Sequence, residues 1–299
     1  MKEFVSAALL LGLALGPVVP RTPPGPPKPR IVVSIFPLLE FAGAVAGEDA
    51  EVSLLLPPGA GVHTWQPRAS DIIRMSEADL FVHVGGGLEP WVGDFLASLS
   101  NRRLRVMAVA DFLEMEKGDH PGEAADPHVW LDFGIDRRIV GRLAKQLGEI
   151  DRARAAGYAD RAAVYDRKLE DLDRQYAEGL AACANRVLLL AGHEAFGYLA
   201  RRYGLRQLSL SGLSPDADPT PKAVISMIET ARRQEVRAVF REAGESPRLA
   251  DLLAEEIPAK VFVLNTGANL SRQDLAAGST FLDLMRANLV NLKQGLGCE

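Results

Sequence analysis

Three of the five histidines lie in loops that follow short apolar runs, His128 at the end of a long loop. His63 lies in "PPGAGVHTWQP", His128 in "DPHVWLD", and His193 follows the run "VLLLA". If the runs are parallel strands, the three loops lie at the carboxyl edges of the sheets, where ligands bind in open α/β folds. Three neutral imidazoles suit zinc, copper, nickel or iron better than magnesium or calcium, which prefer oxygen. The alternative is three unrelated surface histidines.

The other two histidines have different surroundings. His83 lies inside the apolar run "LFVHVG" and is interpreted as a strand residue rather than a ligand. His120 lies in the acidic, polar segment "EKGDHPGEAAD". We interpret that segment as a solvated loop, with a weak metal-collecting segment as the alternative.

The elements that must position these residues form two sets. Short apolar runs alternate with amphipathic segments, a pattern typical of α/β folds with parallel sheets. The runs of the first set are 31–36, 51–56, 79–84 and 104–109, and those of the second are 187–191, 206–210, 236–240 and 260–264. We therefore predict two four-stranded α/β lobes.

A long amphipathic segment separates the two sets. Its apolar residues recur in steps of three and four, at Tyr158, Ala162, Tyr165, Leu169, Leu172, Tyr176 and Leu180. This spacing predicts one helix from about residue 155 to 182, roughly 42 Å long and able to run along both lobes. An internal coiled coil is the alternative. The predicted division is an N-terminal lobe over 31–150, a linking helix over 151–184 and a C-terminal lobe over 185–299.

The N-terminus carries the pattern of an export signal. One lysine precedes an apolar run that is too short to span a bilayer comfortably, and the proline-rich "RTPPGPPKPR" follows. We predict a signal peptide over 1–20 and a tether over 21–30, hence a periplasmic or extracytoplasmic, soluble protein. No cysteine lies near the expected cleavage point, which argues against a lipid-modified signal.

Composition narrows the partners. The net charge of -5 argues against a surface that binds phosphates, so nucleic acid is not an expected partner. Cys183 and Cys298 are the two cysteines. Export permits a disulfide between them, but sequence separation says nothing about distance, and two free thiols are the favoured interpretation.

Several segments, in order, resemble the zinc- and manganese-type solute-binding proteins of ATP-binding-cassette metal importers. The resemblance runs from Ile31 to Leu296. It rests on "HTWQPRASD", "GGGLEPW", "DPHVWLD", "GHEAFGYLARRYGL", "GLSPDADPTPK" and "STFLDLMRANLVNLKQGL". It implies two four-stranded lobes bridged by one long helix, a metal ion bound between them, delivery to a membrane permease, and a monomer.

The resemblance also implies the ligands. The family's metal-binding histidines fall on His63, His128 and His193. Manganese-type members tend to carry a carboxylate at the third position, so His193 favours zinc, with manganese or iron as alternatives. Its neighbour Glu194 is interpreted as a charge in the first turn of a helix. Family members commonly place an aspartate after the last strand, where this chain has Asn265. The fourth ligand is then Asn265, a water or another acid.

A zinc enzyme is the rival class, because three histidines and an open water position also suit hydrolysis. Such an enzyme needs a general base near the water, and no H-E-x-x-H motif occurs. We therefore expect no catalytic residue and favour binding. A third class, an exported adhesin or structural protein, leaves the loop histidines unexplained.

Overall fold

The structure, a computed structural model, describes residues 27–116, 125–213 and 219–298. The strands of this part form two four-stranded, all-parallel sheets, which confirms the predicted fold class. The first has the order β2-β1-β3-β4 and the second β6-β5-β7-β8. The strands are β1 Arg30–Val33, β2 Glu51–Leu54, β3 Leu80–His83, β4 Arg105–Ala108, β5 Val187–Leu190, β6 Arg206–Ser209, β7 Ala238–Glu242 and β8 Lys260–Leu264.

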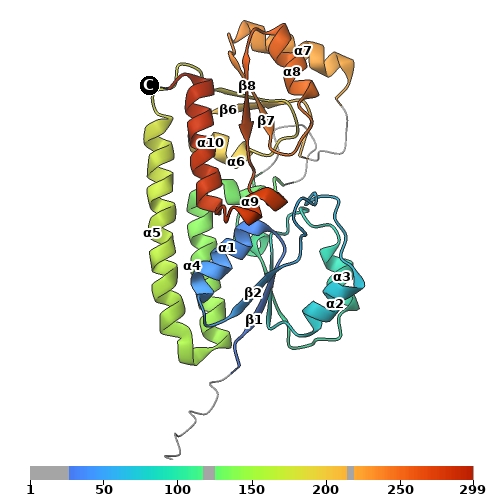
Figure 1. The fold of residues 1–299 in the computed structure, drawn as a ribbon, viewed down its shortest axis with the longest axis vertical. Helices are drawn as coiled ribbons and strands as arrows, with labels where there is room; N and C mark the ends of the chain where they lie inside the picture. The colour runs from blue at the N-terminus through green and yellow to red at the C-terminus, as the bar shows by residue number, and fades with distance from the viewer. Residues whose placement is uncertain (1–26, 117–124, 214–218, 299) are drawn as a thin grey trace, which may run out of the picture.

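Helices connect the strands and cover both faces of each sheet (Figure 1). They are α1 Phe36–Ala46, α2 Ala69–Ser76, α3 Val92–Ser98, α4 Phe133–Ile150, α5 Ala155–Gly179, α6 Gly197–Arg202, α7 Pro221–Arg233, α8 Arg248–Glu256, α9 Arg272–Ala276 and α10 Phe281–Leu296, with 3-10 turns η1 Val109–Phe112, η2 Val129–Leu131 and η3 Arg152–Arg154. In each sheet the second strand is added on one side of the first strand and the third strand on the other side. Ligands bind at the carboxyl edge beside such a switch in strand order.

Strand residues alternate between two faces, as the period of a strand requires. In β1, Ile31 and Val33 join the large core that includes α1, whereas Val32 packs in a second cluster with Trp91 and Phe95. In β5, Leu188 and Leu190 belong to the large core, and Val187 and Leu189 to a cluster with α7 and α8. Both sheets are therefore covered on both faces, and their edges are the places where a ligand can reach them.

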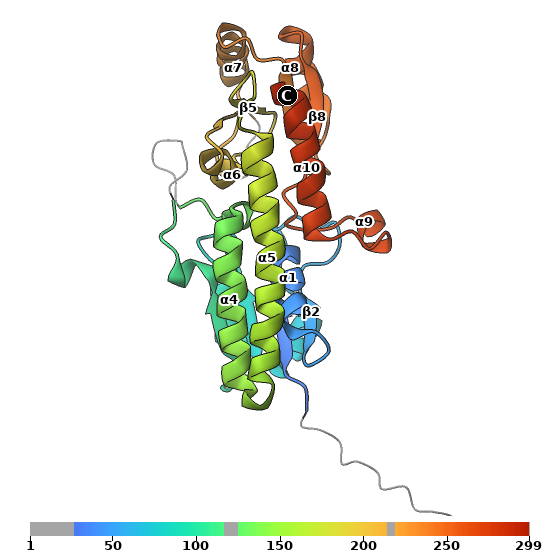
Figure 2. The ribbon, with the colours of Figure 1, turned by 90° about the vertical axis from the view of Figure 1, so that its left-hand side faces the viewer.

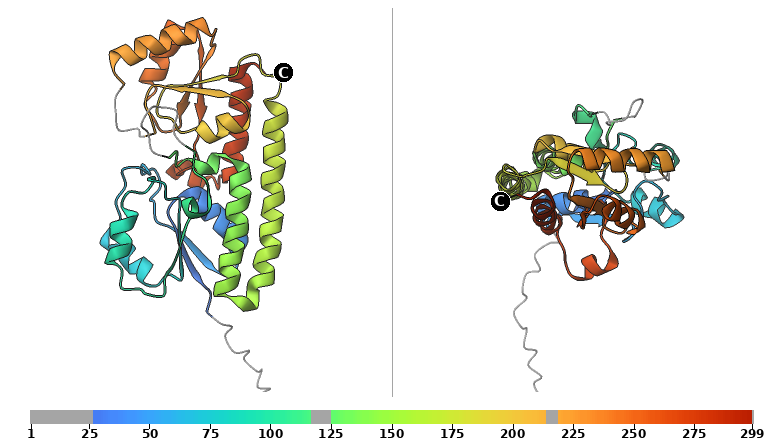
Figure 3. Two further views of the ribbon diagram at one scale, coloured as in Figure 1. Left: turned by 180° about the vertical axis from the view of Figure 1, so that it is seen from behind. Right: turned by 90° about the horizontal axis from the view of Figure 1, so that it is seen from above.

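The long helix α5 buries the stripe that the sequence predicts. Its buried residues are Tyr158, Ala162, Tyr165, Leu169, Leu172 and Tyr176. The helix has 25 residues and is therefore roughly 38 Å long, and it ends at Gly179 rather than near 182. It lies beside α4, and α10 runs along its second half (Figure 2). From behind, the two lobes lie one above the other with α4 and α5 along one side (Figure 3).

One hydrophobic core continues from one lobe into the other. The ring of Phe41 on α1 contacts Tyr165 on α5 and Phe281 on α10, with centroid separations of 5.8 and 5.3 Å. The indole of Trp130 in η2 donates to the backbone oxygen of Thr266 beyond β8, at 2.7 Å. These contacts fix the relative placement of the lobes.

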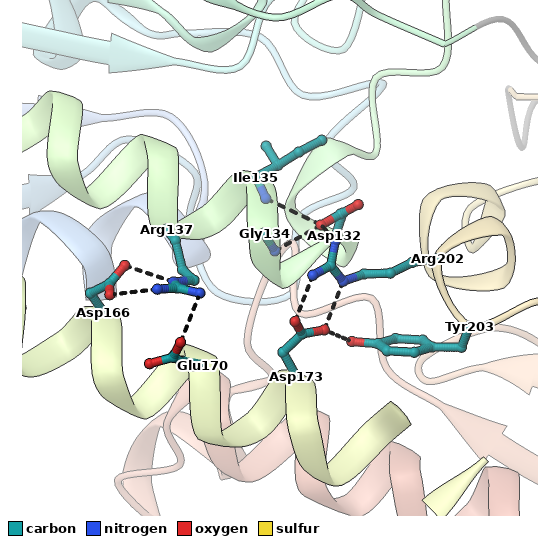
Figure 4. A network of polar contacts seen from close by, with 9 residues as sticks. All are labelled: Asp132, Gly134, Ile135, Arg137, Asp166, Glu170, Asp173, Arg202 and Tyr203. Carbon is teal, nitrogen blue, oxygen red and sulfur yellow. Dashed lines mark hydrogen bonds and ion pairs between the residues drawn. The ribbon is translucent and has the colours of Figure 1, made fainter. Parts of the chain in front are cut away.

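A polar network reinforces this connection (Figure 4). Asp132 caps α4 by accepting from the backbone N–H of Gly134, at 2.7 Å, and pairs with Arg202 of α6 at 2.8 Å. Arg202 also donates two bonds to Asp173 on α5, at 2.7 and 2.6 Å, and Tyr203 donates to the same carboxylate. The start of α4, directly after the His128 loop, is thereby tied to both α5 and α6.

The structure corrects one prediction about the cysteines. Cys183 and Cys298 form a disulfide, so the expectation of two free thiols is wrong. The long helix ends just before Cys183 and α10 just before Cys298, and the two helices run side by side, which brings together residues 115 positions apart.

The remaining predictions concern His83, His120 and the N-terminal segments. His83 ends β3, buried, as predicted for a strand residue. The proposed signal peptide, the first part of the tether and His120 lie outside the described residues. The helices of the described ranges include none that is both long and apolar enough to cross a membrane.

Candidate metal site between the lobes

The three predicted histidines meet in one cleft between the lobes. His63 comes from the loop after β2, His128 lies immediately before η2, and His193 follows β5. The ring centroids are 5.5 Å apart for His63 and His128, 5.6 Å for His63 and His193, and 5.4 Å for His128 and His193. One nitrogen of each ring lies within 4.8 Å of the others. The carboxyl edges of both sheets therefore contribute to a single cluster.

This triangle matches the dimensions of a tetrahedral metal site. With zinc–nitrogen bonds of 2.0–2.1 Å, two imidazoles bound at the tetrahedral angle have ring centroids about 5.3 Å apart. The observed separations of 5.4 to 5.6 Å exceed this value by only a few tenths of an ångström. The rings can thus hold a first-row transition-metal ion with little rearrangement.

His128 is prepared as a ligand by a buried carboxylate. Asp126 is 0% exposed, and its Oδ1 lies 2.9 Å from the ring Nδ1 of His128 and accepts from the backbone N–H of His128 at 3.0 Å. The ring Nε2 is buried, and within the described ranges it has no hydrogen-bond partner. A carboxylate on one ring nitrogen leaves the other free to bind a metal. Burial lowers the pKa of His128, which favours the neutral form that binds metals.

His193 faces two carboxylates on the other side of its ring. Its Nδ1 lies 3.4 Å from Oε2 of Glu242 and 3.5 Å from Oε1 of Glu245. Burial acts to lower the pKa of His193, but the hydrogen bond to the Glu245 carboxylate and the charge of Glu242 outweigh it, and the pKa is raised. The sequence analysis missed both acids. The signal available was an acidic residue at the end of an apolar run, because β7 extends to Glu242.

Asn265 lines the same cleft, but its side chain also organises its own loop. Its Oδ1 accepts from the backbone N–H of Gly267 at 2.7 Å. Its backbone N–H and C=O are bonded to the side chain of Asn288, at 2.8 and 2.7 Å. An asparagine that follows a strand commonly bonds to the backbone in this way. The bond to Gly267 occupies one lone pair of Oδ1, which is the atom of the Asn265 side chain that could bind a metal.

The interpretation of Glu194 as a first-turn residue is wrong. Helix α6 begins at Gly197, so Glu194 lies in the preceding bend, where its side chain is buried. The bend is held by two bonds: Glu194 N–H donates to the oxygen of Gly212 at 2.9 Å, and Phe196 N–H to Oε1 of Gln207, also at 2.9 Å. These bonds delay the helix by about one turn.

Comparison with known proteins decides the family. The sequence model of the family described as "Zinc-uptake complex component A periplasmic" matches residues 31–295. The chain belongs to this family. The resemblance found in the sequence is thereby confirmed.

Two relatives of this chain are named as zinc-binding or zinc-uptake proteins. It is 34% identical over 279 residues to "Zinc-binding lipoprotein AdcA" of Streptococcus pneumoniae (strain ATCC BAA-255 / R6), covering 89% of this chain. The chain spans only 56% of that relative's length. It is 32% identical over 281 residues to "High-affinity zinc uptake system protein ZnuA" of Bacillus subtilis (strain 168), covering 90% of this chain and 88% of the relative.

The fold is shared with a solved zinc-bound structure. The "Zn(II)-bound ZnuA-like domain of Streptococcus pneumoniae AdcA" superposes with a TM-score of 0.79 at 32% identity, covering 90% of this chain and 99% of that one. The two-lobed architecture is thus shared with a domain whose structure contains bound zinc.

Proposed function

We propose that this protein captures one transition-metal ion, zinc, between its lobes and delivers it to the membrane permease of an ATP-binding-cassette importer. The observation that carries the proposal is the triangle of His63, His128 and His193, with the unpartnered Nε2 of His128 in the described structure. A buried ring nitrogen without a partner is costly, and a metal ion relieves that cost. The names of the relatives support zinc as the cargo.

The donor set favours zinc over manganese. Imidazole nitrogens suit zinc, whereas manganese prefers carboxylate, carbonyl and water oxygens. The cluster of His63, His128 and His193 offers three ring nitrogens, and the position after β8 holds a neutral amide; Glu242 and Glu245 form a second group with His193. Manganese or iron remains the secondary cargo.

We propose a binding protein rather than a hydrolase. The carboxylates beside the ligand rings are engaged with Nδ1 atoms: Asp126 lies 2.9 Å from Nδ1 of His128, and Glu242 and Glu245 lie 3.4 and 3.5 Å from Nδ1 of His193. A general base has to reach the metal-bound water. We also propose that the protein is a monomer and that it acts outside the cytoplasm. Its proposed division is an N-terminal lobe over 31–150, a linking helix over 151–184 and a C-terminal lobe over 185–299.

The test replaces each site histidine by alanine. Zinc affinity is measured by competition with a fluorescent chelator, and His83→Ala serves as a control histidine outside the site. The proposal expects steep losses for His63→Ala, His128→Ala and His193→Ala, and wild-type affinity for the control. Wild-type affinity in all three site variants refutes it.

The fourth ligand calls for a separate experiment. Asn265→Asp keeps the acceptor for Gly267 and adds a negative charge to the cleft, so zinc should bind more tightly and manganese should gain more than zinc. Asn185→Asp is a matched control, because Asn185 accepts from Val187 N–H at 2.8 Å in the same way, away from the cleft. Unchanged affinity of Asn265→Asp for both metals removes Asn265 from the site and leaves water or another acid.

A further inference from the structure

The ligands proposed from named residues, three imidazoles and the amide of Asn265, carry no charge. Three neutral imidazoles and the amide of Asn265 leave the charge of a divalent ion uncompensated within the first coordination layer. Uncompensated charge is expensive in a partly buried cleft. The compensating charge must therefore come from groups around the ligands.

Two carboxylates occupy a suitable place behind His193. Glu242 ends β7, and its Oε1 is held by the hydroxyl of Thr266 at 2.6 Å, which turns Oε2 toward the Nδ1 of His193. Glu245 follows three residues later and approaches the same nitrogen. Both line the cleft with the three histidines.

Gly192 makes the approach of Glu245 possible. A Cβ atom at Gly192 would lie 2.7 Å from Oε2 of Glu245, which is too close for any side chain to be accommodated without displacing that carboxylate. The residue before the ligand His193 thus leaves room for a carboxylate to pack against the backbone at this point.

We infer that Glu242 and Glu245 together offset the charge of the bound ion through His193, in place of the carboxylate ligand that Asn265 does not provide. The inference rests on the proposed function. The two acids are positioning residues: they lie against Nδ1, hold the ring so that Nε2 is left for the ion, and increase the basicity of the ring. His128 has the same arrangement with Asp126.

This arrangement has a consequence for selectivity. Because the negative charge lies behind a nitrogen ligand, the ion is neutralised without contacting a hard oxygen anion. The site therefore keeps the nitrogen donors that favour zinc, whereas an acidic ligand would improve manganese binding. Glu242 and Glu245 should strengthen the binding of both metals by a similar factor.

The experiment uses the full chain and the metals alone as probes. Glu242→Gln, Glu245→Gln and the double variant are titrated with zinc and with manganese by chelator competition, and the visible spectrum of the cobalt-loaded form reports the coordination geometry. Glu255→Gln, on the exposed face of α8, is the matched control. Each single variant keeps the test open if the double variant fails to fold.

We expect the double variant to lose about 10- to 100-fold in zinc affinity, with an unchanged zinc-to-manganese ratio and an unchanged cobalt spectrum. Zinc affinity equal to that of wild type overturns the inference, provided that His63→Ala still abolishes binding. A larger loss for manganese than for zinc, with an altered cobalt spectrum, also overturns it, because it identifies a direct carboxylate ligand. If His63→Ala binds zinc normally, the proposed function itself has failed.

Discussion

Replacing Asp126 by asparagine removes one charge and almost nothing else from the candidate site. In the wild type, Oδ1 contacts both the backbone N–H and the ring Nδ1 of His128, and Oδ2 lies 3.2 Å from the Arg201 guanidinium. Asparagine retains Oδ1 as an acceptor for both groups of His128. What is lost is the negative charge behind the ring and one of the anionic partners of Arg201, which also pairs with Glu116.

The size of the effect follows from these contacts. A hydrogen bond to a charged group contributes about 1.5–3 kcal/mol and a neutral one about 1 kcal/mol, so the Nδ1–H bond weakens by about 0.5–2 kcal/mol. A bound dication polarises the imidazole and makes this bond stronger in the loaded protein than in the metal-free one. Because about 1.4 kcal/mol corresponds to a factor of ten, we expect zinc to bind Asp126→Asn about 2- to 30-fold more weakly.

Chelator competition at fixed pH and salt measures this difference directly. Asp166→Asn is the matched control: Asp166 accepts two bonds from Arg137, at 2.8 and 3.0 Å, on the helix α5. The control should keep wild-type zinc affinity. Wild-type affinity in Asp126→Asn, or an equal loss in the control, refutes the reasoning that a charged group behind His128 strengthens the site.

Three further predictions concern acid, a buried acid and the disulfide. Zinc affinity should fall as pH drops from 8 to 5, because protons compete with the metal for the imidazole nitrogens. Of the two buried ligands, His193 has the raised pKa and His128 the lowered one, so His193 should be protonated first. A competition titration that shows the same zinc affinity at every pH would indicate oxygen ligands. Asp136 is fully buried, and within the described ranges its carboxylate oxygens have no hydrogen-bond partner. Burial raises the pKa of Asp136 well above 3.8, so the folded state binds a proton that the unfolded state has already lost. The folded state therefore loses stability as pH rises from about 4 through that raised pKa. Asp136→Ala should therefore stabilise the metal-free protein by about 1–3 kcal/mol at pH 8 and by less at pH 5, and urea unfolding with an equal or larger gain at pH 5 contradicts this. Replacing Cys183 and Cys298 by serine opens a connection between residues 115 positions apart and should cost about 2–5 kcal/mol, which an unchanged urea midpoint would disprove.

The fold could be predicted because its signals are local. The stripe on α5 follows from apolar residues at helical spacing, and each of the eight strands is a short apolar run. Those signals also placed the three histidines in loops beyond the carboxyl ends of strands, since the carboxyl edge of a parallel sheet is defined by chain direction alone.

The groups that complete the site could not be found in this way. Glu242 ends β7 and Glu245 follows it; β7 lies beside β5 in the sheet although β6 separates the two strands in the chain, so nothing local in the sequence pairs these acids with His193. The disulfide depends on α5 and α10 ending side by side, which is a property of tertiary packing. Glu194 was misplaced because side-chain and backbone bonds from Gln207 and Gly212 delay the start of α6.

The most direct test of the account is anomalous diffraction at the zinc absorption edge from crystals of the zinc-loaded protein. The account predicts one strong peak per chain, with a nitrogen of each of His63, His128 and His193 about 2.0–2.1 Å from it. A peak that is bound by Glu242 and Glu245 without His63 and His128, or that lies outside the cleft, would contradict it.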